Sequence, residues 1–122
     1  MHPDWLLPGP FPPPVDTEER CRIEERLNDP AAPEVSLARA IVASGVTTRL
    51  HALDGITERY IVIRGEGLVE VDGRSWRVVP GDRVTIAPGL AQRITNTGAR
   101  PLEFDCICTP RFVPDAYRDL DA

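Results

Sequence analysis

The sequence predicts an all-β domain built as an antiparallel sandwich or barrel, and three observations support this. From Gly45 onward glycines recur at intervals of roughly 8–10 residues, which is the spacing of turns between short strands. The segments between them are rich in Val, Ile, Thr and Tyr, which favour strands. No helical period of useful length runs through the middle of the chain. A small barrel of this kind encloses space for one small ligand.

The N-terminal third is expected to lead into this barrel. Residues 1–14 hold six of the 13 prolines, so they predict an extended arm rather than a helix. Because the arm carries Trp5 and Phe11, we expect it to pack on its own barrel or on a neighbouring subunit. Residues 16–27 fit either a short helix or an edge strand, and the prolines of residues 28–33 predict a loop.

The remaining elements follow the alternation of apolar and polar residues. The pattern predicts strands over residues 36–42, 46–51, from 57 onward, on both arms of a hairpin over 67–79, and over 102–108. Asp72-Gly73 is a preferred two-residue turn for that hairpin. The polar tail fits a short helix or a frayed end. We therefore divide the chain into an arm and lead-in segment (1–33), a barrel (34–114) and a C-terminal tail (115–122).

Composition narrows the class of protein. The chain has 122 residues, enough for one domain, and 14 basic against 19 acidic residues give a net charge of −5. It therefore lacks the basic surface of a nucleic-acid binder. No apolar run approaches the roughly 18 residues of a membrane span, and no secretory signal is visible. We accordingly expect no nucleic-acid or membrane partner. Gly65-Glu66-Gly67 does not begin a helix, so no nucleotide or flavin site is indicated.

Cysteine usage indicates a reducing, cytoplasmic compartment. The odd count of three, Cys21, Cys106 and Cys108, does not suit a disulfide framework. Cys106 and Cys108 are expected to share one face of the last strand with Phe104, as small apolar core residues.

His51 and Glu58 are the first candidates for chemistry. His51 is expected to end a strand, and a short turn leads to the strand that begins with Thr57 and Glu58. Pairing of these two strands would bring the imidazole near the carboxylate. Such a pair can ligate a divalent metal or act as an acid and a base.

One stretch around these residues resembles the first signature motif of the cupin superfamily. That motif runs Gly, five residues, His-x-His, three or four residues, Glu, six residues, Gly. The chain has Gly45, His51, Leu53, Glu58 and Gly65 at those positions, so Leu53 replaces the second histidine.

A later stretch resembles the second cupin motif, which runs Gly, five residues, Pro-x-Gly, two residues, His, three residues, Asn. The chain has Gly81, Pro88, Gly89, Gln92 and Asn96, with the proline shifted by one residue and Gln92 in place of histidine. The resemblance to small single-domain cupins implies an antiparallel double-stranded β-helix, or jelly-roll barrel, beyond a Pro-rich arm. It also implies a homodimer.

The resemblance further implies a metal site. Carried over position by position, it leaves His51, Glu58 and Gln92 as ligands of Fe, Mn, Ni or Zn. Three protein ligands would leave open positions for catalysis. The alternative is that the site is metal-free and that these three residues form a hydrogen-bonded polar cluster inside the barrel.

Two further residues are candidates for the same site. Alternation places Arg49 on the face of His51, and Tyr60 on the face of Glu58. Arg49 could bind a substrate carboxylate, pair with Glu58, or lie in a solvated ion pair at the barrel mouth. Tyr60 could donate a hydrogen bond to a ligand or belong to the core. Glu58, Tyr60 and Arg49 are thus the candidate catalytic residues.

These observations lead to a small cupin barrel that binds a small molecule and acts as a metal-dependent oxygenase, isomerase or lyase. If no metal binds, Glu58 is the expected general base. The alternatives are a metal-free barrel that binds or senses a small ligand, and a structural role centred on the N-terminal arm.

Overall fold

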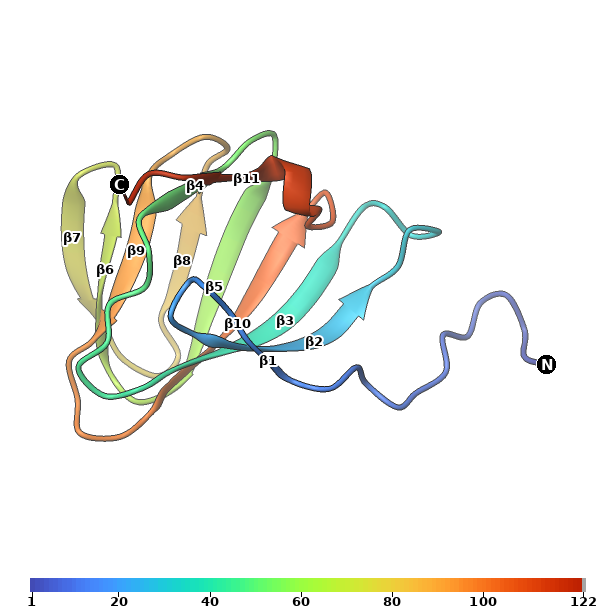
Figure 1. Ribbon diagram of the computed structural model, residues 1–122, viewed down its shortest axis with the longest axis horizontal. Helices are drawn as coiled ribbons and strands as arrows, with labels where there is room; N and C mark the ends of the chain where they lie inside the picture. The colour runs from blue at the N-terminus through green and yellow to red at the C-terminus, as the bar shows by residue number, and fades with distance from the viewer. Residues whose placement is uncertain (122) are drawn as a thin grey trace.

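Two antiparallel β-sheets face each other in the computed structural model, which describes residues 1–121 (Figure 1). The six-stranded sheet has the order β1 (Val15–Asp16), β2 (Arg22–Asn28), β3 (Ser36–Val42), β10 (Leu102–Thr109), β5 (Thr57–Arg64), β8 (Arg83–Ile86). The five-stranded sheet has the order β11 (Tyr117–Asp119), β4 (His51–Leu53), β9 (Gln92–Asn96), β6 (Gly67–Val71), β7 (Arg74–Val78).

The predicted fold class is confirmed. Strands distant in sequence become neighbours in both sheets, as in a double-stranded β-helix. The described part of the chain contains one 3₁₀ turn, η1 (Pro114–Ala116), and no α-helix. Nowhere in residues 1–121 is a helix long and apolar enough to cross a membrane.

The apolar core fills the space between the sheets and leaves room at one end for a cavity. β10 lies between β3 and β5, and its inward residues Leu102 and Phe104 pack with Val42 and Val62, all at most 3% exposed. Burying each such side chain contributes about 1.5–3 kcal/mol. A smaller cluster forms around Leu53 and its neighbours Ile56, Cys108 and Ala116. The cavity described below has walls from both clusters.

Two sharp chain reversals bring these strands into register. Asp72 and Gly73 both have positive φ, 52° and 77°, and join β6 to β7 in the predicted two-residue hairpin. Gly65, between β5 and β6, has φ 83°, and a Cβ there would lie 2.6 Å from the carbonyl oxygen of Pro101. Only glycine fits this close approach of two chain segments.

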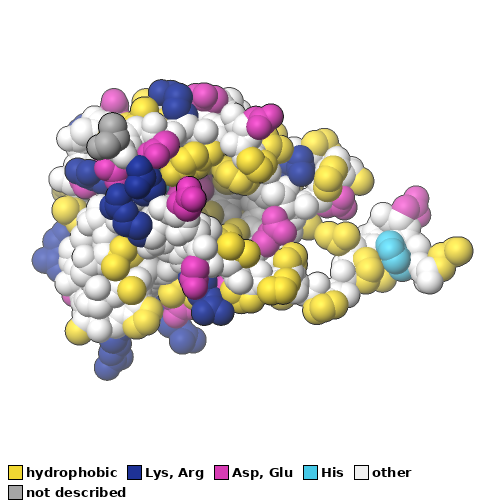
Figure 2. All heavy atoms as spheres, in the orientation of Figure 1, with side chains coloured by type: hydrophobic (Ala, Val, Ile, Leu, Met, Phe, Trp, Pro, Cys, Tyr) yellow, Lys and Arg dark blue, Asp and Glu magenta, His cyan; other side chains and the backbone are white. Residues whose placement is uncertain are grey.

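The lead-in segment forms an edge strand and not a helix. β2 pairs along β3, and the short β1 covers only its first two residues. Residues 1–14 extend away from the barrel (Figure 1). Hydrophobic side chains are exposed along this arm, as Figure 2 shows; Trp5 is 83% exposed. Within one chain the arm contacts the barrel where Arg26 of β2 lies over the ring of Phe11, 4.8 Å from its centroid.

Two sequence-based predictions fail near the cavity. Residues 46–50 were expected in a strand that ends at His51, but regular pairing starts only at His51, which opens β4. The predicted pairing of this segment with the next strand is also absent, because β4 and β5 lie in different sheets. The expected short helix or frayed tail is instead η1 followed by β11, which pairs with β4; Ala122 lies outside the described residues.

Candidate functional site

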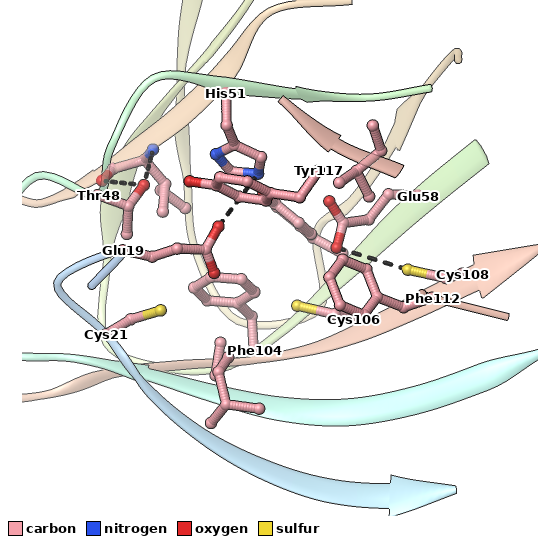
Figure 3. A pocket seen from close by; sticks show the side chains of 15 residues that line it. Glu19, Cys21, Thr48, His51, Glu58, Phe104, Cys106, Cys108, Phe112 and Tyr117 are labelled. Carbon is pink, nitrogen blue, oxygen red and sulfur yellow. Dashed lines mark hydrogen bonds and ion pairs between the residues drawn. The ribbon is translucent and has the colours of Figure 1, made fainter. Parts of the chain in front are cut away.

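A cavity of about 120 Å³ lies between the two sheets. Residues from both sheets, from the turn before β2 and from the C-terminal segment line it (Figure 3). Most of them are apolar or aromatic. The polar groups are two carboxylates, one imidazole, hydroxyl groups and three thiols. The lining residues used below are Glu19, Cys21, His51, Glu58, Tyr60, Ile94, Phe104, Cys106, Cys108, Phe112 and Tyr117.

Glu58 is the most perturbed acid of the cavity. It is 8% exposed; its Oε2 faces the Sγ of Cys108 at 3.7 Å, and its Oε1 has no hydrogen-bond partner. Burial, followed by the charge of Glu19, raises the pKa of Glu58 from 4.5 to about 7. The nearby Gln92 amide and the two thiols of β10 oppose this rise. Near neutral pH the Glu58 side chain can therefore accept or donate a proton.

His51 faces the same cavity from the opposite sheet. The ring is held on both sides: its Nδ1 donates to the carbonyl of Arg49 at 2.8 Å, and it stacks on Tyr117 with centroids 5.0 Å apart. Because Nδ1 makes this hydrogen bond, Nε2 is the ring nitrogen left to face the cavity. Nε2 lies 3.5 Å from Oε1 of Glu19. His51 and Glu19 thus form an imidazole–carboxylate pair in the cavity.

Gln92 and Tyr60 form a buried pair in which Tyr60 lines the cavity and Gln92 is not among the lining residues. Gln92 is 1% exposed and is the cross-strand partner of His51. The Tyr60 hydroxyl donates a hydrogen bond to Oε1 of Gln92, and its ring contacts Phe104 with centroids 4.6 Å apart. Burial, with the nearby Glu58 charge, holds the pKa of Tyr60 well above its usual value. Tyr60 therefore stays protonated and positions Gln92.

Arg49 is not part of the cavity wall. The sequence placed its side chain on the face of His51, but residues 46–50 do not follow strand alternation. Its guanidinium instead pairs with Asp119 of β11 at 2.9 Å on the outer surface. Of the alternatives for this residue, the structure shows an ion pair outside the cavity.

Sequence reasoning missed Glu19, Phe112 and Tyr117. Glu19 enters from the turn before β2, where Arg49 N donates to its backbone carbonyl at 3.2 Å. Tyr117 comes from the C-terminal segment, for which the sequence predicted a short helix or a frayed end. The aromatic residue in a polar tail was the one available signal that this segment packs against something apolar.

The three thiols belong to the cavity, and Cys106 and Cys108 share a face as predicted. Burial is the largest cause that raises the pKa of Cys21 and of Cys108 to about 12. Burial likewise raises the pKa of Cys106. These cysteines stay thiols and are not activated nucleophiles.

The residues present do not fit the divalent metal that the cupin resemblance implies. Oε1 of Gln92, its metal-binding atom, already accepts the Tyr60 hydroxyl. Leu53 packs in an apolar cluster at the position of the missing histidine. Within residues 1–121 no three His, Cys, Asp or Glu side chains are grouped to hold a metal ion. We therefore derive no chemical step through a metal.

Comparison with known proteins supports the fold and the family. The chain is 36% identical over 86 residues to the uncharacterized protein MJ1618 of Methanocaldococcus jannaschii, covering 70% of this chain and 66% of that protein, just under two thirds of its length. A cupin 2 domain-containing protein from Halorhodospira halophila is 30% identical, with a TM-score of 0.69, and the match covers 84% of this chain and 77% of that one.

More distant solved structures share the fold. Pac13 of Streptomyces, described as a nucleoside dehydratase, superposes with a TM-score of 0.77 at 12% identity, covering 94% of this chain and 92% of that one. A predicted oxalate decarboxylase from Thermotoga maritima gives 0.69 at 26% identity, covering 74% and 80%. The family model described as Cupin domain matches residues 39–109, more than half of the chain. The chain therefore belongs to the cupin family of small β-barrel proteins.

Proposed function

We propose that the chain binds a small molecule in the barrel cavity and catalyses proton transfer on it, as an isomerase or lyase without a resident metal. One observation carries this proposal. The carboxyl of Glu58 lies in the cavity wall with a pKa of about 7 and with Oε1 free of any hydrogen bond. A base of this strength is suited to proton transfer at neutral pH.

The other residues of the cavity supply the rest of such a reaction. Glu58 takes a proton from one atom of the ligand. In an isomerase it returns the proton to a neighbouring atom. In a lyase the imidazolium form of His51 gives its Nε2 proton to the leaving group and becomes the neutral ring beside Glu19, while Glu58 keeps the proton it has taken. Tyr60 and Gln92 are positioning residues that fix the wall behind His51. The apolar walls keep water away from Glu58 and the ligand while the proton is transferred.

Distant relatives support lyase chemistry as something the fold can host. Dehydration, named for Pac13, and decarboxylation, named for the Thermotoga maritima protein, both break a bond to carbon. These two reactions are attributed to those proteins only. The substrate of this chain has to be inferred from the residues of its own cavity.

The test is exchange of carbon-bound hydrogen. The full chain is incubated in D₂O with a panel of small carbonyl compounds with and without an amino group, and deuterium incorporation is followed by NMR. We expect exchange above the buffer rate for at least one compound, and its loss in Glu58→Gln. The matched control is Glu18→Gln, which removes the same charge from an exposed residue outside the cavity lining and leaves exchange unchanged. Ligand binding without any exchange would favour the non-catalytic sensing barrel.

The metal hypothesis remains a separate prediction for His51, Glu58 and Gln92, with Fe, Mn, Ni or Zn as the candidates. The free Oε1 of Glu58 is the one observation in its favour. Adding each metal to the chelator-treated protein tests it. Deuterium exchange that appears only with a metal would replace the metal-free proposal.

We also propose a homodimer in which the N-terminal arm packs on a second copy of the chain. Trp5, Leu7 and Phe11 are 83%, 57% and 58% exposed, and β2 has an open edge beyond Ile23. A sheet edge and an apolar arm are both surfaces that proteins usually cover. Deleting residues 1–14 should convert a dimer into a monomer in light scattering. An unchanged mass would refute the role of the arm.

A further inference from the structure

The cavity is acidic and has no cation of its own. Glu19 and Glu58 enter it from opposite sides, and Figure 3 shows both carboxylates directed into the space beside His51. Among residues 1–121 no arginine lines it, and the chain contains no lysine. A negatively charged ligand would meet two carboxylates and no fixed positive charge.

Two arginines that neighbour cavity-lining segments, Arg20 and Arg49, are paired outside the cavity. Arg20, next to Glu19, pairs with Asp121 at 2.7 Å, and Arg49 pairs with Asp119 at 2.9 Å. The C-terminal segment therefore holds these guanidinium groups away from the cavity. They do not cancel the charge of the two glutamates inside it.

Glu58 offers an unfilled hydrogen-bonding position. Glu58 is 8% exposed and lines the cavity, and its Oε1 is almost wholly buried and has no hydrogen-bond partner. Buried polar atoms are almost always hydrogen-bonded, so a vacant acceptor of this kind indicates where a ligand donor would bind. An ammonium group supplies both the donor and the opposite charge.

Aromatic rings make up much of the remaining wall. Tyr60, Phe104, Phe112 and Tyr117 all line the cavity. The face of an aromatic ring attracts an organic cation, and this attraction grows when water is excluded. The two glutamate carboxylates can bind an ammonium group, and the surrounding aromatic rings can contact a compact apolar body. The cavity therefore suits a small amine.

We propose that the ligand is a small organic ammonium compound whose charged nitrogen lies at Glu58 and Glu19 and whose body contacts the aromatic wall. This rests on the proposed function and names its substrate class. The cavity of about 120 Å³ sets the size. An apolar cavity of roughly 150 Å³ holds benzene, so in this smaller cavity the body is no larger than a five-membered ring.

The experiment compares three probes of similar size by NMR titration of the full chain. Cyclopentylammonium carries the positive charge, cyclopentanol can donate a hydrogen bond without charge, and cyclobutanecarboxylate is negative. We expect cyclopentylammonium to bind at least tenfold more tightly than cyclopentanol, with shifts at Ile94 and Cys106, and the carboxylate to bind weakest.

Variants assign the effect to the two glutamates. Glu58→Gln should weaken ammonium binding about tenfold and change cyclopentanol binding less than twofold, whereas Glu18→Gln changes neither. Glu19→Gln at the cavity rim is a second test that does not depend on the fold tolerating a change at Glu58.

Equal or tighter binding of cyclopentanol or the carboxylate, or no ammonium binding, would overturn the proposed ligand class. The deuterium-exchange assay tests the proposed proton transfer independently of the binding assay. Exchange that depends on Glu58 would preserve proton transfer even if the ammonium preference failed.

Discussion

Glu58→Gln should make the protein more stable above neutral pH and change it little in acid. The carboxyl has a pKa of about 7 in the fold against 4.5 ordinarily. Each unit corresponds to about 1.4 kcal/mol, so the ionised carboxylate destabilises the fold by about 3 kcal/mol. Glutamine has nearly the same shape as the protonated acid and carries no charge to bury.

The pH range follows from the direction of the shift. Below pH 4.5 the group is protonated in both the folded and the unfolded chain and adds no penalty. Between 4.5 and 7 the unfolded chain releases its proton first, so the free energy of unfolding falls as pH rises. Above 7 the full penalty is present. The difference between Glu58→Gln and the unmodified protein should therefore grow from near zero at pH 4 to about 3 kcal/mol at pH 8.5.

Urea unfolding followed by fluorescence measures this difference at several pH values. Glu18→Gln, an exposed acid, serves as the control and should show a flat difference. A Glu58→Gln difference that stays constant with pH, or that favours the unmodified protein at alkaline pH, would refute the reasoning about this carboxyl.

Four other substitutions test the packing of the barrel by urea unfolding. Gly65→Ala should cost about 3 kcal/mol or more, because its Cβ would lie 2.6 Å from a backbone oxygen at φ 83°. Gly73→Ala, at φ 77° with nothing within 4 Å, should cost only about 1 kcal/mol, and equal costs would contradict the steric argument. Asn96→Ala should cost about 3 kcal/mol, since this 1% exposed amide makes three hydrogen bonds to the backbone; a neutral result would be inconsistent with that role. Tyr60→Phe leaves Oε1 of Gln92 without its donor and should cost about 1–3 kcal/mol, whereas a stabilised variant would exclude this hydrogen bond as an anchor.

The sequence predicted those parts of the fold that local chemistry determines. The Asp72-Gly73 hairpin follows from the positive φ that its turn needs, and β3 and β10 follow from alternation. Alternation also placed Tyr60 and Glu58 on one face, because both lie within the regular strand β5.

The parts that failed depend on contacts between distant segments. Arg49 precedes β4 in a stretch without regular pairing, so alternation does not apply to it. Its partner Asp119 is 70 residues away in sequence. Glu19 and Tyr117 come from the two ends of the chain and meet only after the barrel has formed. A glutamate in a charged segment does not distinguish a cavity wall from an exposed surface, and Tyr117 indicated only that the tail packs on something apolar.

Elemental analysis combined with deuterium exchange tests the central claim of a metal-free acid–base cavity most directly. The full chain is purified without chelators and without a histidine-rich tag, alongside His51→Ala, and exchange is measured before and after chelation. The account predicts metal well below one equivalent in both proteins, and exchange that chelation does not change. Near-stoichiometric metal that disappears in His51→Ala, with exchange abolished by chelation, would contradict it.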